Sequence, residues 1–170
     1  LIPANPSAHP EAVRAIEDAD MVVVGPGSLF TSIVPNLLIS GISAALGESP
    51  AFKIYVCNVA EEPAQTEGYS VLDPLNIVRH YGGESSIDAV LANSSLPGGE
   101  TSAGLDFIRA NNPWEDDVIL VEADVIDETD DYTQWKRASS AKVGTDPANF
   151  ILLPGYEVKI LRSAGKDEGS

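Results

Sequence analysis

Short apolar segments that alternate with helical stretches constrain the fold of this chain more than any other feature. Each is four to six residues long and lacks regular polar alternation. Strands of this kind are covered on both faces, as in a parallel sheet. The predicted strands are Met21–Val24, Lys53–Asn58, Ile87–Ala92 and Val118–Val121, and the predicted helices are Pro10–Glu17, Ser32–Leu46, Ser70–Tyr81 and Ala103–Ala110. This βαβα order predicts an α/β domain with a mostly parallel sheet and helices on both faces.

The two ends of the chain indicate how much of a domain is present. A doubly wound sheet usually opens with a strand and a glycine-rich phosphate turn, and no such turn precedes Met21. The chain also begins at Leu1 rather than at a methionine. We therefore expect residues 1–162 to form an incomplete domain that lacks its amino-terminal glycine-rich segment. Residues 163–170 are predicted to be a flexible tail.

The charge balance excludes some partners. The formal net charge is −16, from 26 acidic and 10 basic residues, and a basic stripe for phosphate backbones is absent from the sequence, so nucleic acid is not an expected partner. A small anionic ligand remains allowed, because backbone N–H groups at a helix start act at short range. No apolar run approaches the roughly 20 residues of a membrane span. The expected location is the cytoplasm, and the single cysteine, Cys57, suits a reducing compartment.

The acidic runs and the few reactive side chains give little support for catalysis. The runs around residues 115–117 and 122–131 are predicted to form a solvated face, because residues 127–131 lack the glycine and final glutamate of a calcium loop. Cys57 lies in an apolar strand and is predicted to be a core residue. His9 and His80 are predicted at helix boundaries. No catalytic residue and no metal site is therefore assigned.

Two turns carry the candidate site. Residues 25–32, Gly-Pro-Gly-Ser-Leu-Phe-Thr-Ser, follow the first strand, and residues 58–69 follow the second. The carboxyl ends of parallel strands lie at one edge of the sheet, where ligands bind in open α/β folds. Glycines allow close approach of a ligand and hydroxyls supply donors, a composition that suits a phosphate. The alternative is that Ser28, Thr31 or Ser32 only caps the helix, and that Asn36 faces solvent.

The same turn also resembles a known family. The segment GPGSLFTSIVPNLL resembles the carboxyl-terminal part of the gluconeogenesis factor family, which is CofD-like and related to the 2-phospho-L-lactate transferases. AHPEAVRAIEDADMVVVGPGSL precedes the match, and KIYVCNV, TEGYSVLD and SIDAVLAN follow in the family's order. The resemblance extends over about residues 1–93. It implies a Rossmann-like fold.

The resemblance implies a function in two versions. The regulatory members bind UDP-N-acetylglucosamine in the cytoplasm and link central carbon metabolism to cell-wall growth and cell shape. The alternative is an enzyme resembling the 2-phospho-L-lactate transferases of deazaflavin coenzyme biosynthesis, with magnesium as its metal. A homo-oligomer is compatible with either version. The ligand-binding residues expected are Gly25, Gly27, Ser28, Leu29, Thr31, Ser32, Asn36, Asn58 and Thr66.

The sequence departs from the family pattern in two places. The transferases have Gly-Pro-Ser-Asn-Pro where this chain has Gly-Pro-Gly-Ser-Leu, so the regulatory branch fits better. The family commonly has Met-Thr-Gln-Pro-Gly-Glu-Thr after Cys-Asn-Val, whereas residues 60–66 here are Ala-Glu-Glu-Pro-Ala-Gln-Thr. The two additional carboxylates would repel a diphosphate. The family's closing Arg-His-Asp is matched only by Gly-Thr-Asp-Pro at residues 144–147.

Overall fold

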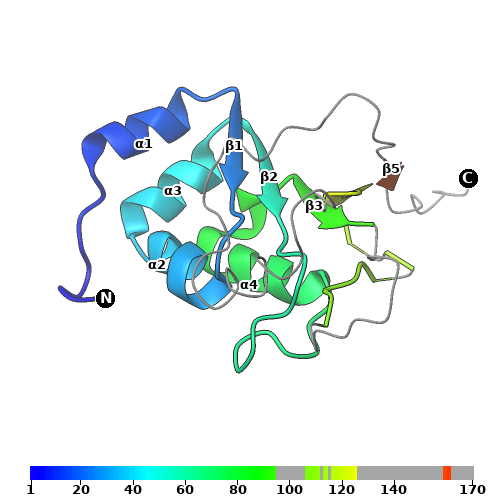
Figure 1. Cartoon of the computed structure of the whole chain (residues 1–170). Helices are drawn as coiled ribbons and strands as arrows, with labels where there is room; N and C mark the ends of the chain where they lie inside the picture. Colours follow the sequence, from blue (N-terminus) through cyan, green and yellow to red (C-terminus); the bar gives the residue numbers. More distant parts are fainter. Residues whose placement is uncertain (95–105, 112, 115, 126–158, 162–170) are drawn as a thin grey trace, which may run out of the picture.

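A computed structural model describes residues 1–94, 106–111, 113–114, 116–125 and 159–161. Within these residues a sheet packs against a layer of helices (Figure 1). The elements in chain order are α1 (Pro10–Glu17), β1 (Met21–Val24), a π-helical turn (Leu29–Ile33), α2 (Val34–Leu37), α3 (Ser40–Glu48), β2 (Phe52–Val56), α4 (Leu72–Gly82), a 3₁₀ turn (Glu84–Ser86), β3 (Ala89–Asn93), β4 (Ile119–Ala123) and β5 (Lys159–Leu161).

The sheet has the topology of a Rossmann-like half. Its strand order is β1-β2-β3-β4-β5, with β1 to β4 parallel and β5 antiparallel to β4. The register places Val24 beside Tyr55 and Val56 beside Leu91, so the carboxyl ends of β1 and β2 lie at the same edge. The predicted α/β fold with a mostly parallel sheet is confirmed.

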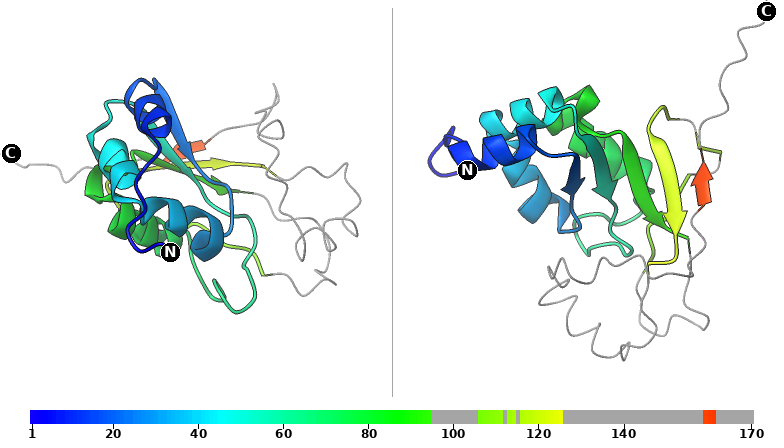
Figure 2. Two further views of the ribbon diagram at one scale, coloured as in Figure 1. Left: turned by 90° about the vertical axis from the view of Figure 1, so that its left-hand side faces the viewer. Right: turned by 90° about the horizontal axis from the view of Figure 1, so that it is seen from above.

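The main core lies between the sheet and the helices. Side chains on one face of β2, β3 and β4, including Tyr55, Val90 and Leu120, pack with Leu37 of α2 and Leu75 of α4. Consecutive right-handed crossovers that move in one direction along a sheet place their helices on one face. Accordingly, the described helices lie together on one side of the sheet (Figure 2).

The opposite face of the sheet carries a second, smaller cluster. Val56, Leu91 and Ala123 are buried there, whereas Met21 and Val23 of β1 are more than half exposed. Helices on this face were part of the sequence prediction, and none of the described helices lies on it. Among the described strands β1 forms one edge of the sheet and β5 forms the other.

Two predicted helices differ from the structure. The predicted helix Ser32–Leu46 is divided, because the helical segments Leu29–Leu37 and Ser40–Glu48 meet at a bend of 78°. The bend allows α2 to pack on α4 while α3 packs on α1. A 3.6-residue periodicity is shared by both segments and therefore does not reveal a change of direction between them.

The second correction concerns the predicted helix Ala103–Ala110. Residues 103–105 lie outside the described part, and residues 106–110 are extended rather than helical. Phe107 pairs with Ala60 and Arg109 pairs with Ser70 in isolated bridges, while Ile108 is buried in the core. This segment finds its hydrogen-bond partners in the long turn after β2, and tertiary pairing overrides its helical propensity.

The predicted solvated acidic face is also partly wrong. Asp116 is 15% exposed and accepts two hydrogen bonds of 3.1 Å from Arg79 at the end of α4. This pair connects α4 to the segment before β4. Asp117 is 84% exposed, as predicted. The predicted features at residues 126–158 and 162–170, including the tail, lie outside the described residues.

Candidate ligand-binding site

The first turn is shaped by close packing against β2. Gly25 has φ of +88°, and a Cβ atom there would lie 2.9 Å from the carbonyl oxygen of Val56. Only glycine adopts this conformation without strain, and only glycine fits this approach. Gly25 is therefore explained by the packing of two strands, independently of any ligand.

The second turn is tied to the first by a pair of hydrogen bonds. The Asn58 side chain accepts a hydrogen bond from the Gly27 N–H over 3.3 Å and donates one to the Gly27 carbonyl over 3.1 Å. An amide side chain satisfies both polar groups of one peptide residue in this way. The two turns predicted to form one site are thus brought together.

Ser28 points across to the second turn. Its hydroxyl donates to Glu62 Oε2 over 2.7 Å and lies 3.4 Å from Gln65 Oε1. Although Ser28 stands at the start of the helix Leu29–Leu37, its side chain forms no capping hydrogen bond. The alternative that Ser28 only caps the helix is therefore wrong.

The carboxylate of Glu62 is held between both turns. Its other oxygen, Oε1, accepts from the Asn58 amide over 3.3 Å. The Glu62 N–H donates to Thr66 Oγ1 over 2.8 Å, and the Thr66 side chain is buried. Thr66 therefore shapes the turn that presents Glu62. We name the set that these contacts connect the turn cluster: Gly27, Ser28, Asn58, Glu62, Gln65 and Thr66.

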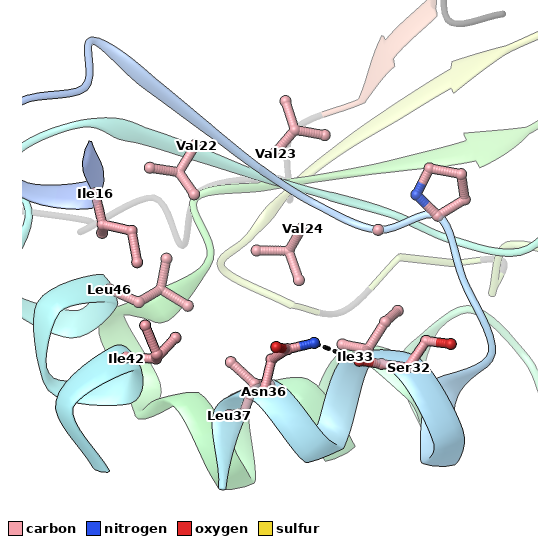
Figure 3. A pocket seen from close by; sticks show the side chains of 12 residues that line it. Ile16, Val22, Val23, Val24, Ser32, Ile33, Asn36, Leu37, Ile42 and Leu46 are labelled. Carbon is pink, nitrogen blue, oxygen red and sulfur yellow. Dashed lines mark hydrogen bonds between the residues drawn. The ribbon is translucent and has the colours of Figure 1, made fainter. Parts of the chain in front are cut away.

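A separate pocket lies at the edge of the sheet. It has a volume of about 320 Å³ and is bounded by β1, α1, α2 and α3. Apolar side chains including Val22, Val24 and Leu46 line most of it, as Figure 3 shows. Its polar side chains are Ser32 and Asn36, and the Asn36 amide donates to the Ser32 carbonyl over 2.7 Å. We name this space the edge pocket.

The structure divides the predicted site residues between these two places. Gly27, Ser28, Asn58 and Thr66 belong to the turn cluster, while Gly25, Ser32 and Asn36 line the edge pocket. Leu29 is 1% exposed and its side chain belongs to the core, so the prediction that it contacts a ligand finds no support in its placement. Thr31 is exposed and belongs to neither place.

Glu62 and Gln65 were not among the predicted site residues. Their contacts with Ser28 cross 34 and 37 positions of sequence, so no local spacing reveals them. The one available signal was the polarity of the second turn, in which Glu62 lies four residues after Asn58. That spacing alone did not distinguish a solvated carboxylate from one held by two donors.

The nearby cysteine is unsuited to nucleophilic chemistry. Cys57 is 3% exposed, and burial raises the pKa of its thiol from 9.0 to about 12. Burial, followed by the neighbouring Cys57, also raises the pKa of Tyr55. The prediction that Cys57 is a core residue is confirmed. Within the described residues no group of three or more His, Cys, Asp or Glu side chains is arranged to hold a metal ion.

No single helix in the described part of the chain is long and apolar enough to cross a membrane. Leu29–Leu37 and Ser40–Glu48 approach that length only when counted together across their bend.

The parallel sheet, the sequential strand order and a polar cluster at the carboxyl ends of β1 and β2 place the molecule in the class of Rossmann-like α/β proteins. The chain belongs to the family described as 2-phospho-L-lactate transferase CofD, whose sequence model matches residues 1–130. The resemblance to the gluconeogenesis factors and their transferase relatives is confirmed.

Curated relatives support the same assignment. A relative from Nostoc sp. is 46% identical over 101 residues, which cover 59% of this chain and 22% of the relative. A relative from Thermotoga maritima is 39% identical over 131 residues, covering 72% of this chain and 41% of the relative. The Bacillus subtilis relative, named gluconeogenesis factor, is 39% identical over 94 residues, which cover 55% of this chain and 30% of the relative. The chain thus spans less than half the length of these relatives.

Solved structures show a similar fold. Two crystal structures of a protein from Bacillus halodurans, one described as a member of the UPF0052 family, share 33% identity with this chain. Their TM-scores are 0.59 and 0.60, and the similarity covers 64% and 65% of this chain and 37% of theirs. The fold is therefore shared over most of the described region.

Proposed function

We propose that the chain contributes part of a nucleotide-sugar site in a regulatory protein of the gluconeogenesis factor type, and that it binds a ligand such as UDP-N-acetylglucosamine without catalysing a reaction. In this role it would act in the cytoplasm and link central carbon metabolism to cell-wall growth and cell shape. The observation that carries the proposal is the junction of the two turns through Asn58 and Gly27, with the Ser28 hydroxyl directed between them.

The chemistry of the turn cluster suits a phosphate group. Ser28 and Asn58 each donate a hydrogen bond to one oxygen of the Glu62 carboxylate, so the two donors converge on one position. Donors arranged to hold one oxyanion can hold another, since carboxylate and phosphate oxygens are both strong acceptors. The cluster also holds one hydroxyl that is hydrogen-bonded to a carboxylate, Ser28 with Glu62, so the choice of binding over catalysis rests on the relatives named gluconeogenesis factor.

Titration calorimetry tests this proposal. UDP-N-acetylglucosamine is titrated into the complete gene product, into Ser28→Ala and into Gly27→Val. We expect Ser28→Ala to weaken binding about threefold or more, because a donor to a charged group is lost. We expect Gly27→Val to abolish binding, because its side chain enters the turn beside Ser32.

The control is Ser43→Ala, which removes a hydroxyl that bonds only within α3. Its affinity is expected to equal that of the unmodified protein. The proposal is overturned if the unmodified protein does not bind the ligand, or if the Ser28 and Gly27 variants bind as tightly as the Ser43 control.

A phospholactyl transferase is the second candidate, because the family model that matches residues 1–130 is described as a 2-phospho-L-lactate transferase. It predicts turnover with a nucleotide-linked phospholactate donor, a deazaflavin precursor and magnesium. Detection of a phospholactyl product by mass spectrometry would replace the regulatory proposal. Absence of product, together with tight binding of the nucleotide sugar, would favour the regulatory proposal.

A further inference from the structure

Glu62 occupies the position that an anionic ligand would take in the turn cluster. Ser28 donates to one of its carboxylate oxygens over 2.7 Å, and Asn58 donates to the other over 3.3 Å. Each donor assigned to the ligand is therefore already used by an anion of the protein itself. A ligand phosphate can reach these donors only after the carboxylate has left.

No cation among the described residues balances the charge of Glu62. Within the described residues Glu62 takes part in no ion pair, and the lysine and arginine pairs lie elsewhere, between Lys53 and Asp88 and around Arg79. A phosphate placed beside the carboxylate would therefore experience repulsion between like charges in a partly buried site, where such repulsion is weakly screened.

The backbone of Glu62 is fixed, but its side chain can turn away. The Glu62 N–H donates to Thr66 Oγ1, and the Glu62 carbonyl accepts from the N–H groups of Gln65 and Thr66. None of these bonds involves the carboxylate. The glutamate side chain has three rotatable bonds, so it can move without unfolding the turn that carries it.

We propose that Glu62 is an internal competitor of the ligand, an autoinhibitory contact that holds Ser28 and Asn58 until the phosphate of a nucleotide ligand displaces it. The inference rests on the proposed nucleotide-sugar function. The apparent dissociation constant then equals the intrinsic constant divided by the fraction of molecules in which Glu62 has turned away. Removing the carboxylate should raise affinity, whereas removing an ordinary contact residue lowers it.

The experiment compares two neighbouring carboxylates in the complete gene product. UDP-N-acetylglucosamine is titrated by calorimetry into the unmodified protein, Glu62→Ala, Glu62→Gln and the control Glu61→Gln. Glu61 accepts a hydrogen bond from the Gly68 N–H and has no bond to Ser28 or Asn58, so its variant changes net charge equally without releasing the donors. We expect Glu62→Ala to bind about tenfold tighter or more and Glu62→Gln to gain less, because its amide oxygen still accepts from Ser28, with less than about twofold change for Glu61→Gln.

A double-mutant cycle tests whether the competition is for Ser28. In the unmodified protein, Ser28→Ala removes a donor to the ligand and also releases Glu62, so the two effects partly cancel. In the Glu62→Ala protein only the loss of the donor remains. We therefore expect Ser28→Ala to weaken binding about threefold more in the Glu62→Ala background than in the unmodified protein.

The outcomes separate the two proposals. If the unmodified protein binds and the Glu62 variants bind no tighter than Glu61→Gln, the competitor role is wrong and the nucleotide-sugar function stands. Strictly additive effects in the cycle also overturn competition for Ser28. If only the Glu62 variants bind, the competitor role is supported. If no protein binds, both proposals fail.

Discussion

Asn58 and Gly27 join the ends of two parallel strands through two reciprocal hydrogen bonds between one side chain and one peptide residue. These two bonds fix the first turn relative to the second, and the contact between Ser28 and Glu62 depends on that placement. The position of one turn relative to the other therefore depends on this amide side chain, while Thr66 shapes the second turn itself.

Changing Asn58 to Asp should destabilise this junction. The carboxylate would face the Gly27 carbonyl and Glu62 without a proton to donate, so two favourable contacts become repulsive. We expect the free energy of unfolding to fall by about 2 kcal/mol in urea denaturation. The control is Asn76→Asp on the exposed surface of α4, which should change it by less than about 0.5 kcal/mol. Equal effects would show that the junction contributes nothing.

Gly25 should tolerate alanine poorly. The new Cβ would meet the Val56 carbonyl oxygen at 2.9 Å, and φ at this position is +88°. We expect Gly25→Ala to cost about 2–3 kcal/mol of unfolding free energy. Gly68 is a matched control, because its φ is +75° and no atom lies within 4 Å of the position that a Cβ would take, so Gly68→Ala should cost about 1 kcal/mol. The difference between the two variants measures the strand contact.

The acidic residues Asp116 and Asp117 should differ sharply although they are neighbours. Asp116→Ala removes a carboxylate that accepts two hydrogen bonds from Arg79 and one from the N–H of buried Val118. The Arg79 guanidinium, 14% exposed, keeps only the more exposed carboxylates of Glu84 and Asp117. We expect a loss of about 2–3 kcal/mol in unfolding free energy. Asp117→Ala removes only an exposed contact of 3.5 Å and should cost less than about 0.5 kcal/mol. Similar losses in both variants would contradict the proposed anchoring of α4.

The stability of the protein should decrease at alkaline pH through Cys57. Burial raises the pKa of this thiol to about 12, so the unfolded chain loses the thiol proton at lower pH than the folded chain. The contribution of the protonated Cys57 thiol to the free energy of unfolding is therefore complete below the ordinary pKa of 9.0, and it is lost as the pH rises from there toward 12. At pH 10.5 we expect a loss of about 2 kcal/mol relative to pH 8.

Urea unfolding of Cys57→Ala at the same two pH values provides the comparison. The phenol of Tyr55 remains in both proteins, and burial, the largest cause of its raised pKa, persists in the variant, so most of its contribution cancels in the difference between them. The fall in stability between pH 8 and pH 10.5 should be smaller in the variant by about the same 2 kcal/mol. Parallel pH dependence in the two proteins would argue against burial of the thiol as its cause.

The sequence by itself determined the elements whose signals are local. The bounds of α1 and β1 match the predictions, because Pro10 and the apolar run Met21–Val24 are read without reference to the rest of the chain. The order of strands and helices determined the parallel sheet, and the segment around GPGSLFTS determined the family.

Only the tertiary structure decided the bend between α2 and α3, the extended conformation of residues 106–110 and the partner of Ser28. Each depends on contacts between residues far apart in sequence, such as Ser28 with Glu62 or Ala60 with Phe107. A periodicity reports which face of an element is apolar, but it does not report which distant polar group that element will meet. Hydrogen-bond partners across more than 30 residues are fixed by packing, so the turn cluster became visible only after the strands had been placed side by side.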